Sequence, residues 1–479
     1  MADISDAPEI KFNPITEGNV PKTLVLFAIP LMFSMLLQVL YAATDLFVIG
    51  LYAGPESISA IANGAQWMHI VMGLVMGLSV GGTVLIGFHV GERNDEDAAR
   101  AVGTMTVLFS AAAIILTPFL AWKTPEFVAL ARVPEEAVGE TIRYIFFCSL
   151  GLPFIIGYNV VSAVYRGLGD SKTPLCFVAI ACSLNIVLDF VFIGSWELAA
   201  KGAAFATVIS QAVSFLLALA YMRWKGFGFP VHLRHFRLYG KCVRKILRVG
   251  IPLSLQDSLI SVSFLIIMVF VNSMGLISSA SVGVAGRIIG FCMMPPVAFA
   301  GAVATMTAQN MGARQPGRAY ASLGYGIGFS LIFGIGTWCF CQLYPELLPG
   351  IFTQDPSVRA GAGLYLKSFT LDCILVSFIF SLNSFFSGCG RSFISMIYSL
   401  ASTFAVRVPA AWWISCLPNA TLYHLGFAAP LATLFSILIA IGYFFRLKKE
   451  LEKRETGESG PDDDAEEENV RKEAPAPGV

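Results

Sequence analysis

Long, continuous apolar segments constrain this chain more than any other feature. About 20 mostly apolar residues are enough to cross a bilayer as a helix, and we count twelve such segments. They lack the period-two alternation that is typical of membrane β-barrel strands. We therefore predict an all-α membrane protein with twelve transmembrane helices. The approximate cores of the predicted spans lie at 24–50, 58–88, 99–122, 140–165, 173–195, 201–222, 247–272, 280–307, 320–344, 361–386, 393–416 and 422–445.

The composition supports a membrane protein and excludes several other classes. Of the 479 residues, 56% are hydrophobic and 13% are charged, whereas about a quarter of the residues of a soluble protein are charged. The formal net charge is zero, so no nucleic-acid partner is expected. The ten cysteines form no CxxC pattern, and we interpret them as small hydrophobic residues without a disulfide framework or a metal site.

The distribution of basic residues predicts the orientation of the spans. The connection at 223–248 carries eight Lys and Arg residues and no acid. Other connections of the same parity also carry arginines, whereas the opposite connections carry mainly glutamates. Because cytoplasmic loops are enriched in Lys and Arg, we expect a multi-pass protein of the cell membrane with both termini in the cytoplasm.

The sequence also matches itself at an offset of 221 residues. Gly91 then pairs with Gly312, and Arg93 pairs with Arg314. Each half holds six spans, an even number, so both halves enter the membrane from the same side. This parallel repeat predicts two six-helix bundles with a cleft between them, an architecture that suits alternating access. We expect an N-terminal segment at 1–20, an N-terminal lobe at 21–222, a basic linker at 223–245, a C-terminal lobe at 246–446, and a disordered charged tail at 447–479.

Two carboxylates lie within spans of the N-terminal half. Asp45 and Asp189 have no Lys or Arg at a matching depth, and a charge within a span costs about 3 kcal/mol on insertion scales. Gln38 and Tyr41 share a helical face with Asp45, and we predict that both, with Asn159, line the substrate cavity. These charges indicate a functional site, unless they only cap helix kinks or bond to the backbone.

Further oxygen ligands surround this pair in the sequence. Asn185 precedes Asp189 by four residues and shares its helical face, and Thr207 lies in the next span. Carboxylate, amide and hydroxyl groups suit a proton, Na⁺ or a similar hard cation. Two neighbouring carboxylates in a low-dielectric site also tend to share a proton. Asn159, in the fourth span, either faces the cleft or makes a packing hydrogen bond.

Four charged residues lie within spans of the C-terminal half. Asp257, Arg287, Asp372 and Arg407 are able to cancel one another as ion pairs, which we favour, or the two acids bind a second cation.

Several phrases resemble the multidrug and toxic compound extrusion (MATE) transporters. They are LLQVLYAATDLFVIGLYAG, YRGLGDSKTP, LNIVLDFVFIG and GAAFAT, in this order, and the similarity extends from about residue 16 to 446. The resemblance implies two six-helix lobes and export of organic molecules driven by inward H⁺ or Na⁺ movement. It places the coupling site on Asp45, Asn185, Asp189 and Thr207, with Tyr41 and Asn159 as looser matches to cavity positions.

We therefore expect a cation-coupled antiporter that exports amphipathic, often cationic organic compounds. It would act as a monomer among membrane lipids, without a cofactor other than its coupling ion. The alternative is a flippase for a lipid-linked saccharide, whose phosphates would require arginines in the cleft, with Arg287 and Arg407 as the candidates. No nucleophile elbow, phosphate loop or metal-ligand cluster indicates an enzyme.

Overall fold

The computed structural model describes residues 13–131, 133–418 and 420–455, which are helical throughout apart from short connections. Asparagines or prolines begin many of the helices; Asn94, for example, accepts a hydrogen bond from the backbone N–H of Asp97 at the start of α4. The helices are α1 Pro14–Glu17, α2 Val20–Tyr52, α3 Pro55–Gly91, α4 Asp95–Leu130, α5 Glu135–Gly167, α6 Lys172–Asp189, η2 Phe190–Ser195, α7 Ala199–Lys225, η3 Leu233–His235, α8 Gly240–Ser273, α9 Leu276–Cys292, α10 Met294–Gly312, α11 Pro316–Leu343, α12 Pro349–Phe352, α13 Pro356–Phe369, α14 Leu371–Gly388, α15 Ser392–Ser402, η4 Thr403–Arg407, α16 Val408–Ser415, α17 Leu422–Leu425 and α18 Ala428–Glu455.

Within the described residues, twelve helical segments are long and apolar enough to cross a membrane. Some of them consist of successive helices, such as α6 with η2, and α9 with α10. A helix satisfies its backbone hydrogen bonds internally, which is what a bilayer interior requires. The predicted all-α fold with twelve spans is confirmed.

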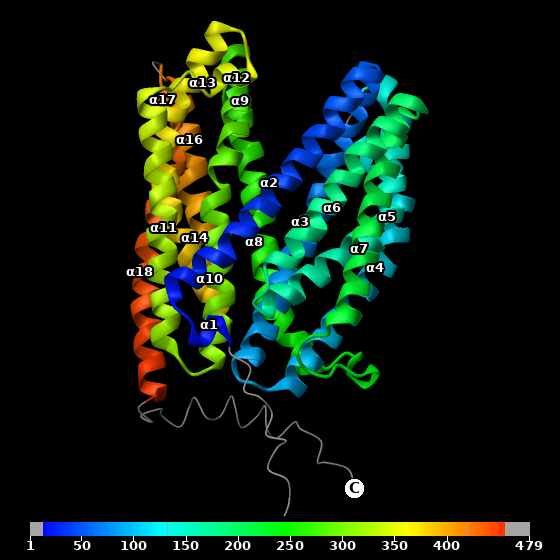
Figure 1. Cartoon of the computed structure of the whole chain (residues 1–479). Coiled ribbons are helices and arrows are strands. Elements are labelled where there is room, and N and C mark those ends of the chain that lie inside the picture. The colour runs from blue at the N-terminus through cyan, green and yellow to red at the C-terminus, as the bar shows by residue number, and fades with distance from the viewer. Residues whose placement is uncertain (1–12, 132, 419, 456–479) are drawn as a thin grey trace, which may run out of the picture.

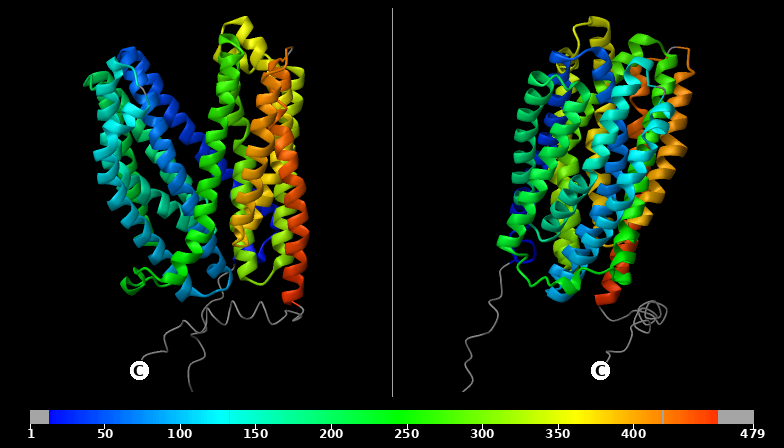
Figure 2. Two further views of the ribbon diagram at one scale, coloured as in Figure 1. Left: turned by 180° about the vertical axis from the view of Figure 1, so that it is seen from behind. Right: turned by 90° about the vertical axis from the view of Figure 1, so that its right-hand side faces the viewer.

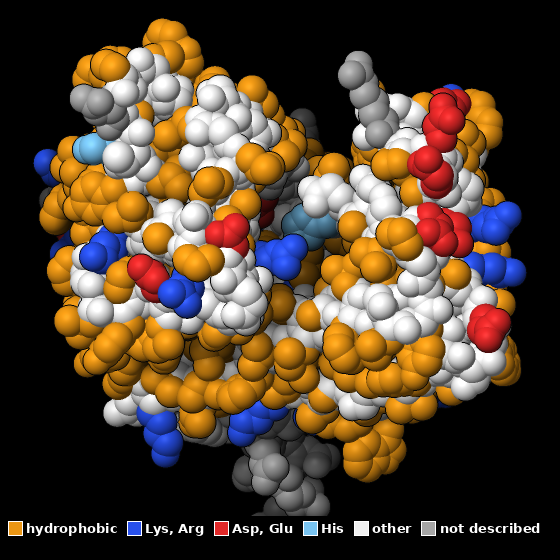
Figure 3. All heavy atoms as spheres, turned by 90° about the horizontal axis from the view of Figure 1, so that it is seen from above, with side chains coloured by type: hydrophobic (Ala, Val, Ile, Leu, Met, Phe, Trp, Pro, Cys, Tyr) orange, Lys and Arg blue, Asp and Glu red, His pale blue; other side chains and the backbone are white. Residues whose placement is uncertain are grey.

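The helices form two lobes that diverge toward one end of the molecule (Figures 1 and 2). Helices α3–α7 belong to one lobe and α9–α18 to the other, with α2 and α8 running between them. At the end where α1 and the last turns of α18 lie, the lobes are in contact. We call this the closed end and the opposite one the open end. Viewed from the open end, the surface is hollowed between the lobes (Figure 3).

The internal repeat is visible in the turns that end equivalent helices. Arg93 and Arg314, which follow α3 and α10, both adopt left-handed backbone conformations with φ of 54° and 56°. Gly169 and Gly390, which follow α5 and α14, have φ of 90° and 74°. Equivalent residues thus close the helices with the same left-handed C-terminal turn. The two halves are built alike, as the sequence predicted.

The first helix of each half crosses into the opposite lobe at the closed end. Leu24 and Phe27 of α2 belong to the apolar core that contains Phe385 of α14. In the second half, Ile246 of α8 belongs to the core that contains Leu152 of α5. The start of α2 thus packs in the C-terminal lobe and the start of α8 in the N-terminal lobe. This differs from the predicted lobe boundaries, because sequence order alone does not show that a long helix can change partners along its length.

Close helix contacts join the two halves of the chain. Helix α3 packs against α8 and α10 of the other half. A Cβ atom on Gly81 of α3 would overlap the carbonyl oxygen of Ile246 in α8. Ser254 of α8 donates a hydrogen bond to the carbonyl of Leu74 in α3 at 3.0 Å. Small residues in membrane helices permit such close backbone approach.

Two predicted segments outside the lobes contain more regular structure than expected. Helix α18 extends to Glu455, so the first part of the predicted disordered tail is helical. Leu447 is buried in the core and Leu451 packs against it; their spacing of four residues continues the apolar face. The predicted linker at 223–245 contains the end of α7, the short helix η3 and the first turns of α8. Residues 456–479 lie outside the described residues.

Candidate functional site

The four residues predicted to couple a cation come together within the N-terminal lobe. Helices α2, α6 and α7, which carry them, pack against one another. The exposed fractions are 5% for Asp45, 0% for Asn185, 0% for Asp189 and 8% for Thr207. Asp45 and Asp189 lie close enough for a direct electrostatic interaction, and the Asn185 side chain also approaches Asp45. The structure therefore groups residues that are as much as 162 positions apart in the chain.

The polar atoms of this group lack hydrogen-bond partners within the described residues. They are Asp45 Oδ1, both side-chain atoms of Asn185, both carboxylate oxygens of Asp189, and Thr207 Oγ1. Neither carboxylate forms an ion pair with a described Lys, Arg or His side chain. Buried polar groups are normally satisfied, because desolvation without a partner is costly. This donor set fits a proton or a hard cation such as Na⁺.

A wider helical turn follows Asp189 directly. Residues Phe190–Ser195 form the π-helix η2, which continues α6 without a break. Such π-turns occur frequently at functional sites, where they shift the register of side chains. No residue pattern in this span indicated the π-turn.

The predicted cavity residues divide into three cases. Tyr41 is half-buried, and its hydroxyl group lies near Thr207 and Asp45. Gln38, one turn earlier on α2, is exposed. Asn159 is buried, and its amide donates a hydrogen bond to the carbonyl of Ile155 in its own helix at 2.8 Å. Only Tyr41 therefore adjoins the carboxylates directly.

Two residues of α5 border the site and were not predicted. Tyr144 and Cys148 are buried, and both interact with Asp45; Tyr144 also interacts with Tyr41. They are four residues apart and so share one helical face. A tyrosine and a cysteine in an apolar span resemble ordinary packing residues, so only the shared spacing would have indicated them.

The four charged residues of the C-terminal lobe differ in their surroundings. Among the described side chains, none of Asp257, Arg287, Asp372 and Arg407 appears in an ion pair within 4 Å. Asp372 and Arg407 are buried, whereas Asp257 and Arg287 are exposed. The guanidinium of Arg407 lies 3.8 Å from the ring centroid of Phe264, a cation–π contact. The ring thus occupies one face of Arg407. Asp372 and Arg407 still lie within electrostatic range of each other, so an ion pair between them stays a prediction.

Helix irregularities are shared by the two halves. Arg407 is the last residue of the π-helix η4, in the span that corresponds by order to the one containing η2. A buried carboxylate thus precedes one π-helix and a buried guanidinium ends the other. The two lobes share a backbone pattern and differ in the sign of the charge beside it.

The fold defines the class before any comparison. It is a polytopic membrane protein with two repeated lobes and a hollow between them. Among the described residues, the N-terminal lobe alone contains a buried carboxylate pair. The sequence profile of the MatE family matches residues 30–191 and 252–413, once in each half. The chain therefore belongs to the MATE family of transporters.

Known proteins similar to this chain span most of its length. It is 29% identical to the probable multidrug resistance protein YpnP of Bacillus subtilis over 407 residues, which covers 84% of this chain and 89% of the relative. It is 27% identical to the probable multidrug resistance protein NorM of Thermotoga maritima, covering 84% and 87%. A solved outward-facing structure of a multidrug resistance MATE family transporter shares the fold, with a TM-score of 0.85, 23% identity and coverage of 92% and 98%.

Proposed function

We propose that this protein exports amphipathic, often cationic organic compounds in exchange for H⁺ or Na⁺. The observation that carries the proposal is the buried pair Asp45 and Asp189, in which Asp45 Oδ1 and both carboxylate oxygens of Asp189 lack hydrogen-bond partners in the described residues. A fixed internal cation would satisfy such a pair permanently. A carboxylate pair without a fixed counter-charge is suited to a cation that enters and leaves.

In the proposed cycle, the lobes alternate between two arrangements. In one, they touch at the closed end and the hollow faces the open end; in the other, they part at the closed end. Binding of a proton or Na⁺ at Asp45, Asp189, Asn185 and Thr207 changes the packing of α2, α6 and α7. Because α2 also packs in the other lobe, a change in its position can be transmitted to both.

We also propose how the protein is oriented in the membrane and which molecules surround it. The connection between α7 and α8 is rich in Lys and Arg, which supports a cytoplasmic closed end by the positive-inside rule. Both termini would then be cytoplasmic, in the cell membrane. We propose a monomer that needs membrane lipids and small organic substrates, and that carries out transport without an enzymatic step.

The names of the two relatives support drug export, because both are described as probable multidrug resistance proteins. Those names do not favour a flippase for a lipid-linked saccharide. Arg407 is moreover buried against Phe264, and only Arg287 of the two candidate arginines is exposed for a phosphate.

Binding of a fluorescent organic cation tests the proposal directly. We expect H⁺ or Na⁺ to compete with the dye in the purified wild-type protein in lipid nanodiscs. The Asp189→Asn variant should bind the dye without that competition, because one of the two charges is gone. Equal competition in both proteins would contradict a coupling role for this pair.

A further inference from the structure

Residues 13–18, which we call the strap, lie between the two lobes at the closed end. They include the short helix α1 and precede α2. Ile15 is almost fully buried and belongs to the apolar core of the C-terminal lobe. Its side chain also packs under the turn at Gly169 of the N-terminal lobe, where a Cβ atom would overlap it. The strap is thus in contact with both lobes.

Polar contacts fasten the strap to the C-terminal lobe. Arg318 of α11 donates hydrogen bonds to the carbonyls of Ile15 at 3.0 Å and Gly18 at 2.6 Å. The same guanidinium donates to the Asn310 side chain at 3.2 Å, and the Asn310 amide lies 3.5 Å from the Ile15 carbonyl. These donors are held within one lobe, so this attachment does not depend on where the other lobe lies.

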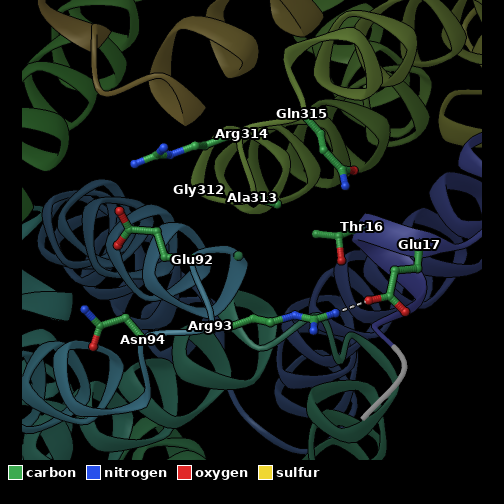
Figure 4. A pocket seen from close by; sticks show the side chains of 10 residues that line it. Thr16, Glu17, Glu92, Arg93, Asn94, Gly312, Ala313, Arg314 and Gln315 are labelled. Atoms are coloured by element: carbon green, nitrogen blue, oxygen red, sulfur yellow. Dashed lines mark hydrogen bonds and ion pairs between the residues drawn. The ribbon is translucent and has the colours of Figure 1, made fainter. Parts of the chain in front are cut away.

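One ion pair joins the strap to the N-terminal lobe. Glu17 binds the guanidinium of Arg93, at the turn between α3 and α4. It is the single polar contact between the strap and that lobe among the described residues. Figure 4 shows the pair at the edge of a cavity of about 540 Å³, lined by the strap and by the turns that follow α3 and α10. Glu92, which also lines the cavity, pairs with His89 at 2.7 Å instead.

The repeat supplies a contrasting arginine. Arg314 occupies the position equivalent to Arg93 and has the same left-handed backbone. Its side chain extends away from Glu17 across the cavity (Figure 4). No ion pair involves it in the described part of the chain. Two arginines of equal chemistry thus flank one cavity, and one of them holds the strap.

The second half has its own docked segment. There the segment supplies the basic side chain and the lobe supplies the acidic one, the reverse of the pair at the strap. Residues 233–239 lie against the N-terminal lobe, where Thr104 donates a hydrogen bond to the carbonyl of Arg237 at 3.1 Å. Glu96 of that lobe also pairs with Arg234 at 3.2 Å. Each half therefore sends its leading segment to the opposite lobe, but only the strap bridges both lobes through an acid of its own.

We propose that the strap stays on the C-terminal lobe throughout the transport cycle, and that the Glu17–Arg93 ion pair is a latch favouring the arrangement that is closed at this end. When the lobes part here, the attachments through Arg318 persist, whereas Glu17 and Arg93 separate. The latch regulates access to the cleft from the side of the termini. This inference rests on the lobe movement in the proposed function.

Distance measurements on the full-length protein test the latch. Spin labels carried by a ketone-bearing amino acid replace Lys172 and Lys449, which are exposed on the two lobes; this avoids thiol chemistry with the ten cysteines. Pulsed dipolar spectroscopy in lipid nanodiscs, at several pH values with and without Na⁺, then gives the fraction of molecules with the lobes apart. We expect Glu17→Gln to raise the ratio of parted to closed molecules roughly two- to five-fold, the range for a partly exposed ion pair.

Matched variants separate the latch from other effects. Arg93→Gln should act like Glu17→Gln, and the exchange variant Glu17→Arg with Arg93→Glu should restore the wild-type ratio. Arg314→Gln should leave the ratio unchanged. A wild-type ratio in Glu17→Gln, or an exchange variant no closer to wild type than the single variants, would overturn the latch while leaving the lobe movement intact. A single distance for the wild-type protein under every condition would contradict the lobe movement itself, and with it both proposals.

Discussion

Gly91 and Gly312 lie against each other's helices where α3 and α10 cross at the closed end. A Cβ atom on Gly91 would overlap the carbonyl oxygen of Gln309, and one on Gly312 would overlap that of Phe88. The two glycines occupy equivalent positions of the repeat, so the molecule places the same feature on both sides of one helix crossing. A side chain at either position would force the backbones apart.

We expect Gly91→Ala and Gly312→Ala each to destabilise the crossing by about 1–3 kcal/mol, the usual cost of overpacking. The apparent melting temperature in detergent measures the effect. Gly324→Ala is the control, because nothing lies within 4 Å of the position its Cβ would take. Equal melting temperatures for Gly91→Ala and Gly324→Ala would contradict close packing at the crossing.

The docked segment at 233–239 offers a second glycine comparison. A Cβ atom on Gly103 would overlap the carbonyl oxygen of His235, whereas its repeat partner Gly324 faces open space. Gly103→Ala should displace this segment and speed tryptic cleavage after Arg234 and Arg237 several-fold. Limited proteolysis followed by mass spectrometry measures the rate. Cleavage no faster than in wild type would show that the segment does not depend on this contact.

The last turns of α18 should contribute to stability. Leu447 is 2% exposed in the core of the C-terminal lobe, so Leu447→Ala should cost about 2–5 kcal/mol. Leu438, on the same helix, is 65% exposed, and Leu438→Ala serves as the control. Thermal unfolding of both variants measures the difference. Equal melting temperatures for Leu447→Ala and Leu438→Ala would contradict the packing of the last turns of α18 in the core.

Much of this architecture follows from local sequence patterns. The twelve spans and the repeat were predictable because apolar length and fixed spacing are properties of the chain alone. The grouping of Asp45, Asn185 and Asp189 was predictable for a similar reason, since unpaired charges in apolar helices must avoid lipid.

Other features depend on contacts between distant segments and left no local signal. The burial of Ile15 between the lobes requires knowing where α10 ends and α11 begins. The contact of Arg407 with Phe264 depends on how η4 packs against α8, which charge counting does not show. The helical turns beyond Arg446 were missed because charged residues outnumber apolar ones there, although Leu447 and Leu451 keep the helical spacing.

The central claim is that the carboxylate pair couples export to a cation gradient. Efflux of an organic cation from proteoliposomes, with pH and Na⁺ gradients imposed independently, tests it most directly. We predict that wild-type protein transports faster with one of these gradients, and that Asp45→Asn loses this acceleration while keeping its fold, as judged by an unchanged melting temperature. Asp257→Asn should keep the acceleration. Gradient-driven efflux by Asp45→Asn at the wild-type rate would contradict the account.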